Sequence, residues 1–90
     1  MTKAEIVAQI AEKTGVEKGA TQAVVESFMD IVKDSIKNDN PVYLRGFGSF
    51  IKKTRKEKMG RNIKKGTSIV IPEHSIPAFK PAKTFVNEMK

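Results

Sequence analysis

A run of basic side chains is the most chemically distinctive feature of the sequence. Residues 52–65 include eight cations and a single acid, Glu57, so this run carries +7, which equals the net charge of the whole chain. The cations are Lys52, Lys53, Arg55, Lys56, Lys58, Arg61, Lys64 and Lys65. Ammonium and guanidinium groups bind phosphate oxygens. A charge excess focused on one segment therefore points to a polyanion partner, most often a nucleic acid.

Residues that suit β-strands stand on both sides of this run. Phe50 and Ile51 precede it, Ile69–Ile71 follow it, and Gly60-Arg61-Asn62 suits a tip between two strands. The pattern predicts a long β-hairpin arm over about residues 52–66. A two-stranded ribbon fits a DNA groove. Residues 52–66 contain no aromatic residue for stacking on unpaired bases, so the arm favours a duplex. The alternative is a solvated charged hairpin without a partner.

Two helical patterns precede the arm. Thr2-Lys3-Ala4-Glu5 has the form of a capping box and Gly15 suits a left-handed cap, which predicts a helix from about Lys3 to Thr14. A longer pattern begins near Lys18 and ends at the turn-forming residues 38–41. The apolar face of this second pattern, which includes Val24, Phe28 and Ile31, is wider than the first helix can cover. We therefore expect a partner subunit.

The rest of the chain reads as a small sheet and a last helix. Residues 42–44 form a short strand, and Gly46-Phe47-Gly48 turns the chain into the arm, with both glycines expected to adopt angles closed to other residues. Pro72 suits a bulge or an edge, and residues 76–79 close the sheet. Beyond Pro81, a short helix is expected to turn Phe85, Val86 and Met89 inward. The order ααβββα predicts an α+β domain with one protruding hairpin.

Length and composition limit the possibilities further. Ninety residues allow one domain, and a chain this small is marginally stable alone. The sequence has no cysteine and only one histidine, so neither a disulfide nor a structural zinc site is expected. A dimer is the remaining usual solution. No segment suits a membrane span or a signal peptide, so a cytosolic location without membrane contact is expected.

Three motifs together resemble the bacterial HU/IHF family of histone-like DNA-bending proteins. They are Gly46-Phe47-Gly48-Ser49-Phe50, Gly60-Arg61-Asn62, and Ile76-Pro77-Ala78-Phe79 with Lys83 behind it. The similarity covers residues 1–90 as a single domain, divided into a helical dimerisation part (1–40), a sheet with its arm (41–80) and a C-terminal helix (81–90). It implies an intertwined homodimer whose two arms enter the minor groove of duplex DNA and bend it in a bacterial nucleoid.

The resemblance also implies roles for individual residues. Lys53, Arg55, Lys58 and Arg61 would lie along the groove and its phosphates, with Asn62 at the tip. Lys3, Lys80 and Lys83 would meet the flanking backbone, and Arg45 could face the groove. Phe28, Phe47, Phe50 and Phe79 would belong to the dimer core. Because strand side chains alternate, Arg55 and Lys58 would point to opposite faces unless the arm twists strongly or bulges between them.

Ile63 departs from the family pattern, which has proline directly after Gly-Arg-Asn. Isoleucine is among the apolar side chains that can wedge between base pairs. Its backbone is less rigid than that of proline, and its N–H requires a partner. We predict that Ile63 intercalates from a less preorganised tip; the alternative is that it packs on a sugar without inserting.

Other candidate sites and functions are weaker. His74, the single histidine, is expected at the surface, and Asp30 and Asp34 on a mixed-charge helix face are not expected to bind metal. No nucleophile–base pair or phosphate loop suggests an enzyme, a cofactor or a small-molecule substrate. The expected function is binding and bending of duplex DNA with low sequence specificity, and preferably of nicked or flexible DNA. The alternatives are a site-specific IHF-like factor, a polyanion or RNA scaffold, and a small nuclease.

Overall fold

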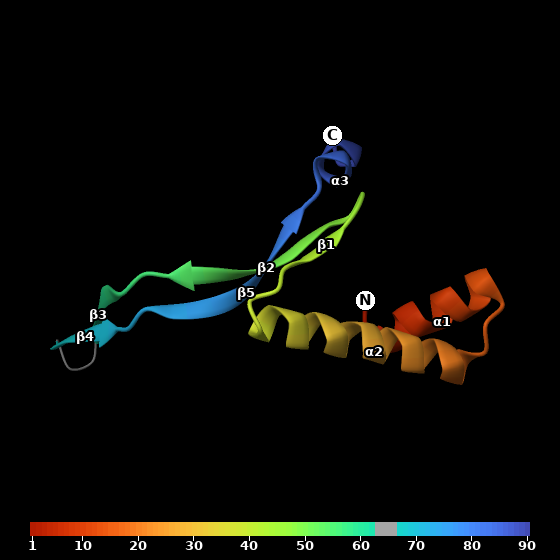
Figure 1. Cartoon of the computed structure of the whole chain (residues 1–90), viewed down its shortest axis with the longest axis horizontal. Helices are drawn as coiled ribbons and strands as arrows, with labels where there is room; N and C mark the ends of the chain where they lie inside the picture. The colour runs from red at the N-terminus through yellow and green to blue at the C-terminus, as the bar shows by residue number, and fades with distance from the viewer. Residues whose placement is uncertain (63–66) are drawn as a thin grey trace. The chain divides into compact units, whose positions relative to one another are not determined.

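The computed structural model describes the backbone of residues 1–62 and 67–90 and the side chains of residues 1–60 and 70–90. Within these residues the chain forms two compact units, residues 1–34 and 35–90. The elements, drawn in Figure 1, are α1 (Lys3–Thr14), α2 (Lys18–Lys37), β1 (Val42–Leu44), β2 (Gly48–Arg55), β3 (Lys58–Asn62), β4 (Thr67–Ile71), β5 (His74–Pro81) and α3 (Lys83–Glu88).

The start and end of α1 follow the sequence signals. The hydroxyl of Thr2 accepts a hydrogen bond from the amide of Glu5 at 3.3 Å, which satisfies one of the free N–H groups of the first turn. At the other end, Gly15 adopts φ 77° and donates its N–H to the carbonyl of Ala11 at 2.9 Å. The predicted limits of this helix are therefore confirmed.

In the first unit, α1 and the N-terminal part of α2 share a small interior. Val7 of α1 is 2% exposed and Thr21 of α2 is 3% exposed. The Thr21 hydroxyl donates to the carbonyl of Glu17 at 2.9 Å, so this buried polar group is satisfied. Among the described side chains, the buried hydrophobic residues are Val7, Val32 and Ile36 alone. Such a thin interior cannot stabilise a chain of this length without further contacts.

The second unit contains a three-stranded antiparallel sheet in the order β1-β2-β5. β1 pairs with β2 from Val42↔Phe50 to Leu44↔Gly48, and β2 pairs with β5 over its whole length, from Gly48↔Pro81 to Arg55↔His74. β3 and β4 form a separate two-stranded sheet beyond this one. The predicted α+β class and the predicted protruding hairpin are confirmed, and Figure 1 shows the hairpin as a long ribbon that continues β2 and β5.

The strand count differs from the predicted ααβββα order because the hairpin is interrupted. Lys56 and Glu57 on one side face Pro72 and Glu73 on the other, and none of these four residues is part of a strand. Pairing resumes at Lys58↔Ile71 with the register unchanged. Proline has no N–H to donate to a strand ladder, which explains why the ribbon is broken beside Pro72. There is no added residue on either strand and therefore no bulge.

Gly48 corrects a second expectation. Gly46 adopts φ 81°, and Phe47 donates its N–H to the carbonyl of Leu44 at 3.0 Å, as in a type II turn. Gly48, however, lies in β2 and is not among the described residues with positive φ. A Cβ atom there would lie 2.6 Å from the backbone oxygen of Lys80 and from the ring of Phe79. Glycine is needed at position 48 for close approach of two strands, and not for an unusual backbone angle.

Candidate nucleic-acid interface

Strand register places three of the predicted contact residues on one face of the sheet. Directly paired residues of antiparallel strands share a face, and side chains along one strand alternate. Lys53 and Arg55 of β2 are two residues apart, and Ser49 on the same face pairs with Lys80 of β5. Lys53, Arg55 and Lys80 are all exposed. They form a row of cations along one face of β2 and β5, which we call the cationic row.

Beyond Arg55, the described part of the ribbon adds further exposed cations. Lys56 lies in the interruption and Lys58 begins β3, and both side chains are exposed. The interruption also affects the question of whether Arg55 and Lys58 point to opposite faces. Since no bulge separates them and the register is unchanged, only the unpaired residues 56–57 allow their directions to depart from strict alternation.

The interruption has one internal contact of its own. Nδ1 of His74 lies 3.0 Å from the carbonyl oxygen of Pro72. Because a carbonyl can only accept, the tautomer with its proton on Nδ1 donates a hydrogen bond to this oxygen. His74 is exposed, as predicted. Its contact lies at the point where β4 ends and β5 begins.

The arm's tip is described in part. Arg61 and Asn62 pair with Ser68 and Thr67 through their backbones at the end of β3 and β4. The predicted roles of Ile63, Lys64 and Lys65 fall outside the described residues.

A second group of cations surrounds an open hollow at the end of the sheet. Arg45, Lys80 and Lys83 line it, together with Tyr43 and Ser49, and its volume is about 480 Å³. The turn of residues 44–47 presents Arg45, and the N–H of Ala82 donates to the carbonyl of Phe47 at 2.9 Å, which fixes the start of α3 beside that turn. Tyr43, 74% exposed, was not predicted here. Its place opposite Ser49 follows from pairing that the sequence alone does not give.

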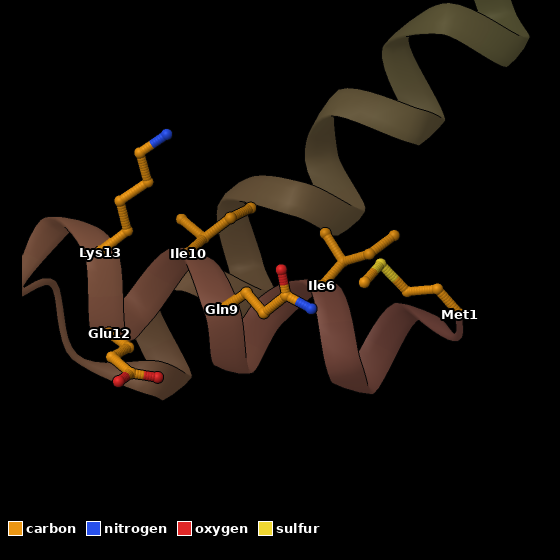
Figure 2. Close-up of a pocket in the computed structure, with 6 residues that line it drawn as sticks. All are labelled: Met1, Ile6, Gln9, Ile10, Glu12 and Lys13. Carbon is orange, nitrogen blue, oxygen red and sulfur yellow. The ribbon is translucent and has the colours of Figure 1, made fainter.

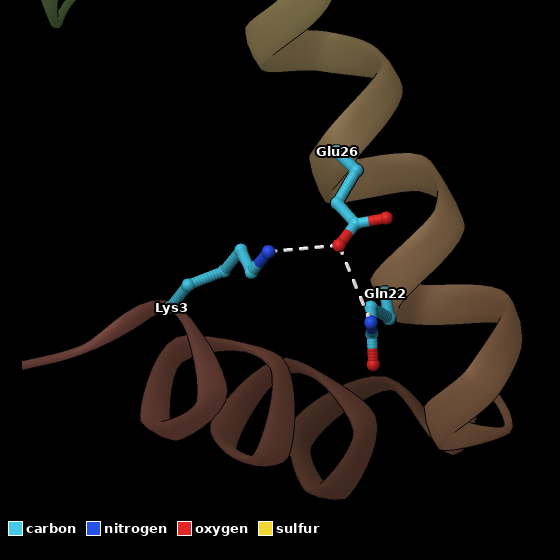
Figure 3. Close-up of polar contacts among 3 residues, drawn as sticks. All are labelled: Lys3, Gln22 and Glu26. Atoms are coloured by element: carbon cyan, nitrogen blue, oxygen red, sulfur yellow. Dashed lines mark hydrogen bonds and ion pairs between the residues drawn. The ribbon is translucent and has the colours of Figure 1, made fainter.

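Lys3, another predicted contact, belongs to the first unit. Its Nζ lies 2.8 Å from Oε1 of Glu26, and Nε2 of Gln22 donates to the same oxygen at 3.3 Å, as Figure 3 shows. The hydrogen bond from Lys3, with that from Gln22 and the charge of Lys3, holds the pKa of Glu26 below its ordinary value. Lys3 thus ties the start of α1 to α2.

Lys52 occupies a different place from its neighbours in the arm. It lies between Phe50 and Thr54 on the face opposite the cationic row. Its Nζ is 2.8 Å from Oδ1 of Asp39 and donates to the carbonyl of Lys37 at 3.4 Å. Both acceptors stand at the C-terminal end of α2.

Four phenylalanine rings form a cluster in the second unit. The ring of Phe47 lies 5.0 Å from that of Phe79, 5.8 Å from that of Phe85 and 6.4 Å from that of Phe50, between ring centroids. The rings of Phe50 and Phe79 are 5.1 Å apart. Phe47 remains 46% exposed and Phe79 39% exposed. The cluster therefore joins three predicted dimer-core residues to Phe85, and it is incompletely covered.

The first unit also leaves apolar surface uncovered. Val24 is 68% exposed, Phe28 43% and Ile31 67%, and these side chains line a hollow along α2. On α1, Ile6 and Ile10 line another open hollow of about 540 Å³, which Figure 2 shows with Met1 beside them. A monomeric protein rarely exposes large side chains in such continuous groups.

Potential metal-ligating side chains do not cluster in the part of the chain that the structure describes. No group of three or more potential ligand residues is present among those residues. No helix within them is long and apolar enough to cross a membrane.

Comparison with known proteins also points to DNA binding, and the similarity extends over the whole chain. The family model described as "Bacterial DNA-binding protein" matches residues 1–90. The chain is 39% identical to "SPbeta prophage-derived DNA-binding protein HU 2" of Bacillus subtilis (strain 168), over all of this chain (100%) and 98% of that protein. It is also 39% identical to "Integration host factor subunit beta" of Herminiimonas arsenicoxydans, over 92% of this chain and 83% of that one.

A solved structure is similar at the level of the backbone. The structure titled "Anabaena HU-DNA cocrystal structure" superposes with a TM-score of 0.94 and 35% sequence identity, and the match covers 99% of this chain and 97% of that one.

Proposed function

Because this chain belongs to the bacterial DNA-binding protein family, whose model spans its whole length, we propose that it is an architectural protein that binds and bends duplex DNA. The observation that supports this most directly is the cationic row. Lys53, Arg55 and Lys80 share one face of β2 and β5, at the root of a ribbon that fits a groove. Relatives named for DNA binding, and a neighbour whose title names a complex with DNA, support the same function.

We assign the contacts by their place in the fold. The arm would supply contacts along the minor groove, and the hollow at the end of the sheet would receive the phosphate backbone that flanks the groove. The proposed arm contacts are Lys53, Arg55, Lys56, Lys58, Arg61, Asn62, Lys64 and Lys65. The proposed flanking contacts are Arg45, Lys80, Lys83 and Lys3. A phosphate would compete with Glu26 for Lys3, because that ion pair already uses the ammonium.

A second copy of the chain completes this proposal. Among the described residues, three apolar surfaces remain exposed to solvent in the single chain. They are the apolar residues of α2, the hollow on α1 and the phenylalanine cluster. A homodimer would cover these surfaces and would bring two arms to one DNA molecule. The whole chain would then form a single domain, with the two units completed by those of the partner.

Low sequence specificity follows from the proposed contacts. Phosphate contacts carry no sequence information, and the minor groove mainly separates A·T from G·C pairs. Such a protein would act in the cytoplasm on a bacterial nucleoid, without catalysing a reaction. A site-specific role is the second candidate, since a relative named as an integration host factor subunit has the same sequence identity, 39%, over a somewhat shorter match. A footprint at one discrete site would favour it.

The test is binding to three short ligands of the same sequence: an intact DNA duplex, a nicked one and an RNA duplex, each at two salt concentrations. We expect nicked DNA to bind best because less deformation energy is needed. RNA should bind worst because its minor groove is wide and shallow. Equal binding to all three would mean that the arm binds polyanions through charge alone, and the architectural function would be withdrawn.

Ile63 is the proposed wedge. The bend angle produced by the wild-type protein should exceed that produced by Ile63→Ala, because an alanine side chain is too short to unstack a base step. An unchanged bend in the variant would exclude intercalation and leave Ile63 as a residue that packs on a sugar.

A further inference from the structure

Lys52 stands where the arm separates from the body of the second unit. β1 accompanies β2 only as far as the pair Val42↔Phe50. Past Phe50, β2 is paired with β5 alone. Lys52 is therefore at the root of the two-stranded ribbon, and the direction in which the ribbon leaves the sheet is set by what holds this root.

The contacts of Lys52 lead to the C-terminal end of α2. Its ammonium is 2.8 Å from the carboxylate of Asp39 and 3.4 Å from the carbonyl oxygen of Lys37. The Lys52 side chain is 30% exposed, whereas that of Asp39 is 78% exposed. Lys52, although exposed like the cations of the cationic row, thus contacts the turn that follows α2.

A positive charge at this end of α2 is electrostatically stabilising. The carboxyl end of a helix carries a partial negative charge from its unpaired carbonyls. Asp39 adds a full negative charge there and adopts φ 59°, a left-handed conformation that is unfavourable for most residues with a side chain. Ser35 holds the turn by donating its hydroxyl to the carbonyl of Asn40 at 2.7 Å. The Lys52 ammonium contacts both the Asp39 carboxylate and the Lys37 carbonyl.

Within the described part of the chain, apolar side chains do not pack closely between the ribbon root and the turn. A hollow of about 380 Å³ lies beside the contacts of Lys52, lined by Ile36 and Pro41 on one side and by Ile51 and Thr54 on the other. Beyond the last β1–β2 pair, Val42↔Phe50, the polar contacts of Lys52 add a further link between the ribbon root and the turn.

We propose that Lys52 is a positioning residue that fixes the direction of the arm, and that it does not contact DNA phosphates. The inference rests on the proposed function, since the direction of the arm matters only if the arm enters DNA. Without the contact between Lys52 and Asp39, the arm samples more directions, and a smaller fraction of molecules has the arm placed for binding. The consequence is weaker binding, while the number of phosphates neutralised in the complex stays the same.

The salt dependence of DNA affinity separates the two roles. Each phosphate that a variant no longer neutralises reduces the slope of log K against log salt by about 0.9. Lys52→Met should weaken binding to nicked duplex DNA by roughly two- to five-fold at low salt, the range given by an exposed ion pair. The deficit shrinks as salt screens that pair, so the slope should fall by less than it does for a lost phosphate contact. Lys53→Met, the matched control on the opposite face, should reduce the slope.

Asp39→Asn makes the test independent of the lysine. If Lys52 is a positioning residue, this variant binds more weakly although it has lost a repelling acid. If Lys52 contacts phosphates, releasing it from Asp39 gives tighter binding and a steeper slope, which would overturn the inference. The exchanged pair, Lys52→Asp with Asp39→Lys, keeps the net charge and should recover part of the affinity that Lys52→Asp loses.

The outcomes also separate this inference from the proposed function. A slope that falls as much for Lys52→Met as for Lys53→Met would make Lys52 a phosphate contact and leave the function intact. A wild-type protein whose affinity does not depend on salt would reject the function itself. Thermal unfolding of each variant confirms that the comparison is between folded proteins.

Discussion

At the scale of single residues, the decisive property is which cations are available to a phosphate. Arg55 is exposed on the cationic row, whereas Lys52, three residues before it, is engaged at the end of α2. Composition cannot separate them, because both belong to the same run of basic residues. Strand alternation places them on opposite faces, and the structure shows which of these faces meets the turn after α2.

Arg55→Ala therefore tests whether the cationic row binds phosphate. The variant should bind duplex DNA more weakly, with a slope of log K against log salt reduced by about 0.9 for each phosphate left without its cation. Lys33→Ala removes the same charge from a residue of α2 that is not among the proposed contacts, and it should leave the slope unchanged. Filter binding over a salt series measures both. Equal slopes for Arg55→Ala and the wild type would remove Arg55 from the interface.

The Lys3–Glu26 pair predicts a pH dependence of stability. The pKa of Glu26 in the folded chain lies below its ordinary value of 4.5, mainly because of the hydrogen bond from Lys3. The stabilisation by this pair is thus fully present above that ordinary value and is lost as the pH falls through the folded-state pKa. Chemical denaturation across the acid range should show that the wild type loses more stability than Glu26→Gln. Parallel curves for the two proteins would contradict this.

At the scale of elements, local sequence signals determine the limits of α1, whereas contacts between strands determine which residue is required in the sheet. The limits of α1 follow from local signals, Thr2 at one end and Gly15 at the other, and these are readable in the sequence. The reason for Gly48 is not local. It lies in the distance to Lys80 and Phe79 on another strand, so the sequence alone suggested backbone freedom instead of close approach.

The two glycines of this region should therefore respond differently to alanine. Gly48→Ala places a methyl group against backbone atoms of β5, an overpacking that costs about 1–3 kcal/mol. Gly46→Ala meets open space and pays only for a left-handed backbone angle, about 1 kcal/mol. Denaturant unfolding of the two variants measures the difference. A larger loss for Gly46→Ala would show that β2 and β5 do not approach as closely as described.

The interruption of the arm shows a similar limit of sequence reasoning. Pro72 indicated an irregularity, but not that residues 56–57 would leave the ladder together with residues 72–73 while the register continued. The register continues because each strand has two unpaired residues, and this equality can be recognised only once the paired residues on both sides of the interruption are known.

At the scale of the whole molecule, the exposed apolar surface requires a partner. Ile31 is 67% exposed on α2, beside Val24 and Phe28. The sequence predicted this surplus from the width of one helical face, because amphipathic spacing shows how much must be covered. It could not show that Phe85 joins the phenylalanine cluster, since that contact links elements far apart in the chain.

Ile31→Glu tests the proposed homodimer. A charge in a buried interface costs several kcal/mol unless it is paired, so the variant should sediment as a monomer or be unfolded at concentrations where the wild type is a dimer. Met59→Glu, at an equally exposed apolar residue of the arm (67%), is the control and should remain dimeric. A dimeric, folded Ile31→Glu protein would place the interface elsewhere.

The central claim is that two arms of one dimer bend duplex DNA. The most direct measurement is energy transfer between dyes on the two ends of a duplex of about 30 base pairs, a length at which a bend of 40–90° costs only about 1–6 kcal/mol. Saturating protein should increase the transfer, and nicked DNA should reach the same final value at lower protein concentration. Salt-dependent binding with no change in transfer would contradict the account, because it would leave a basic ribbon that binds DNA without deforming it.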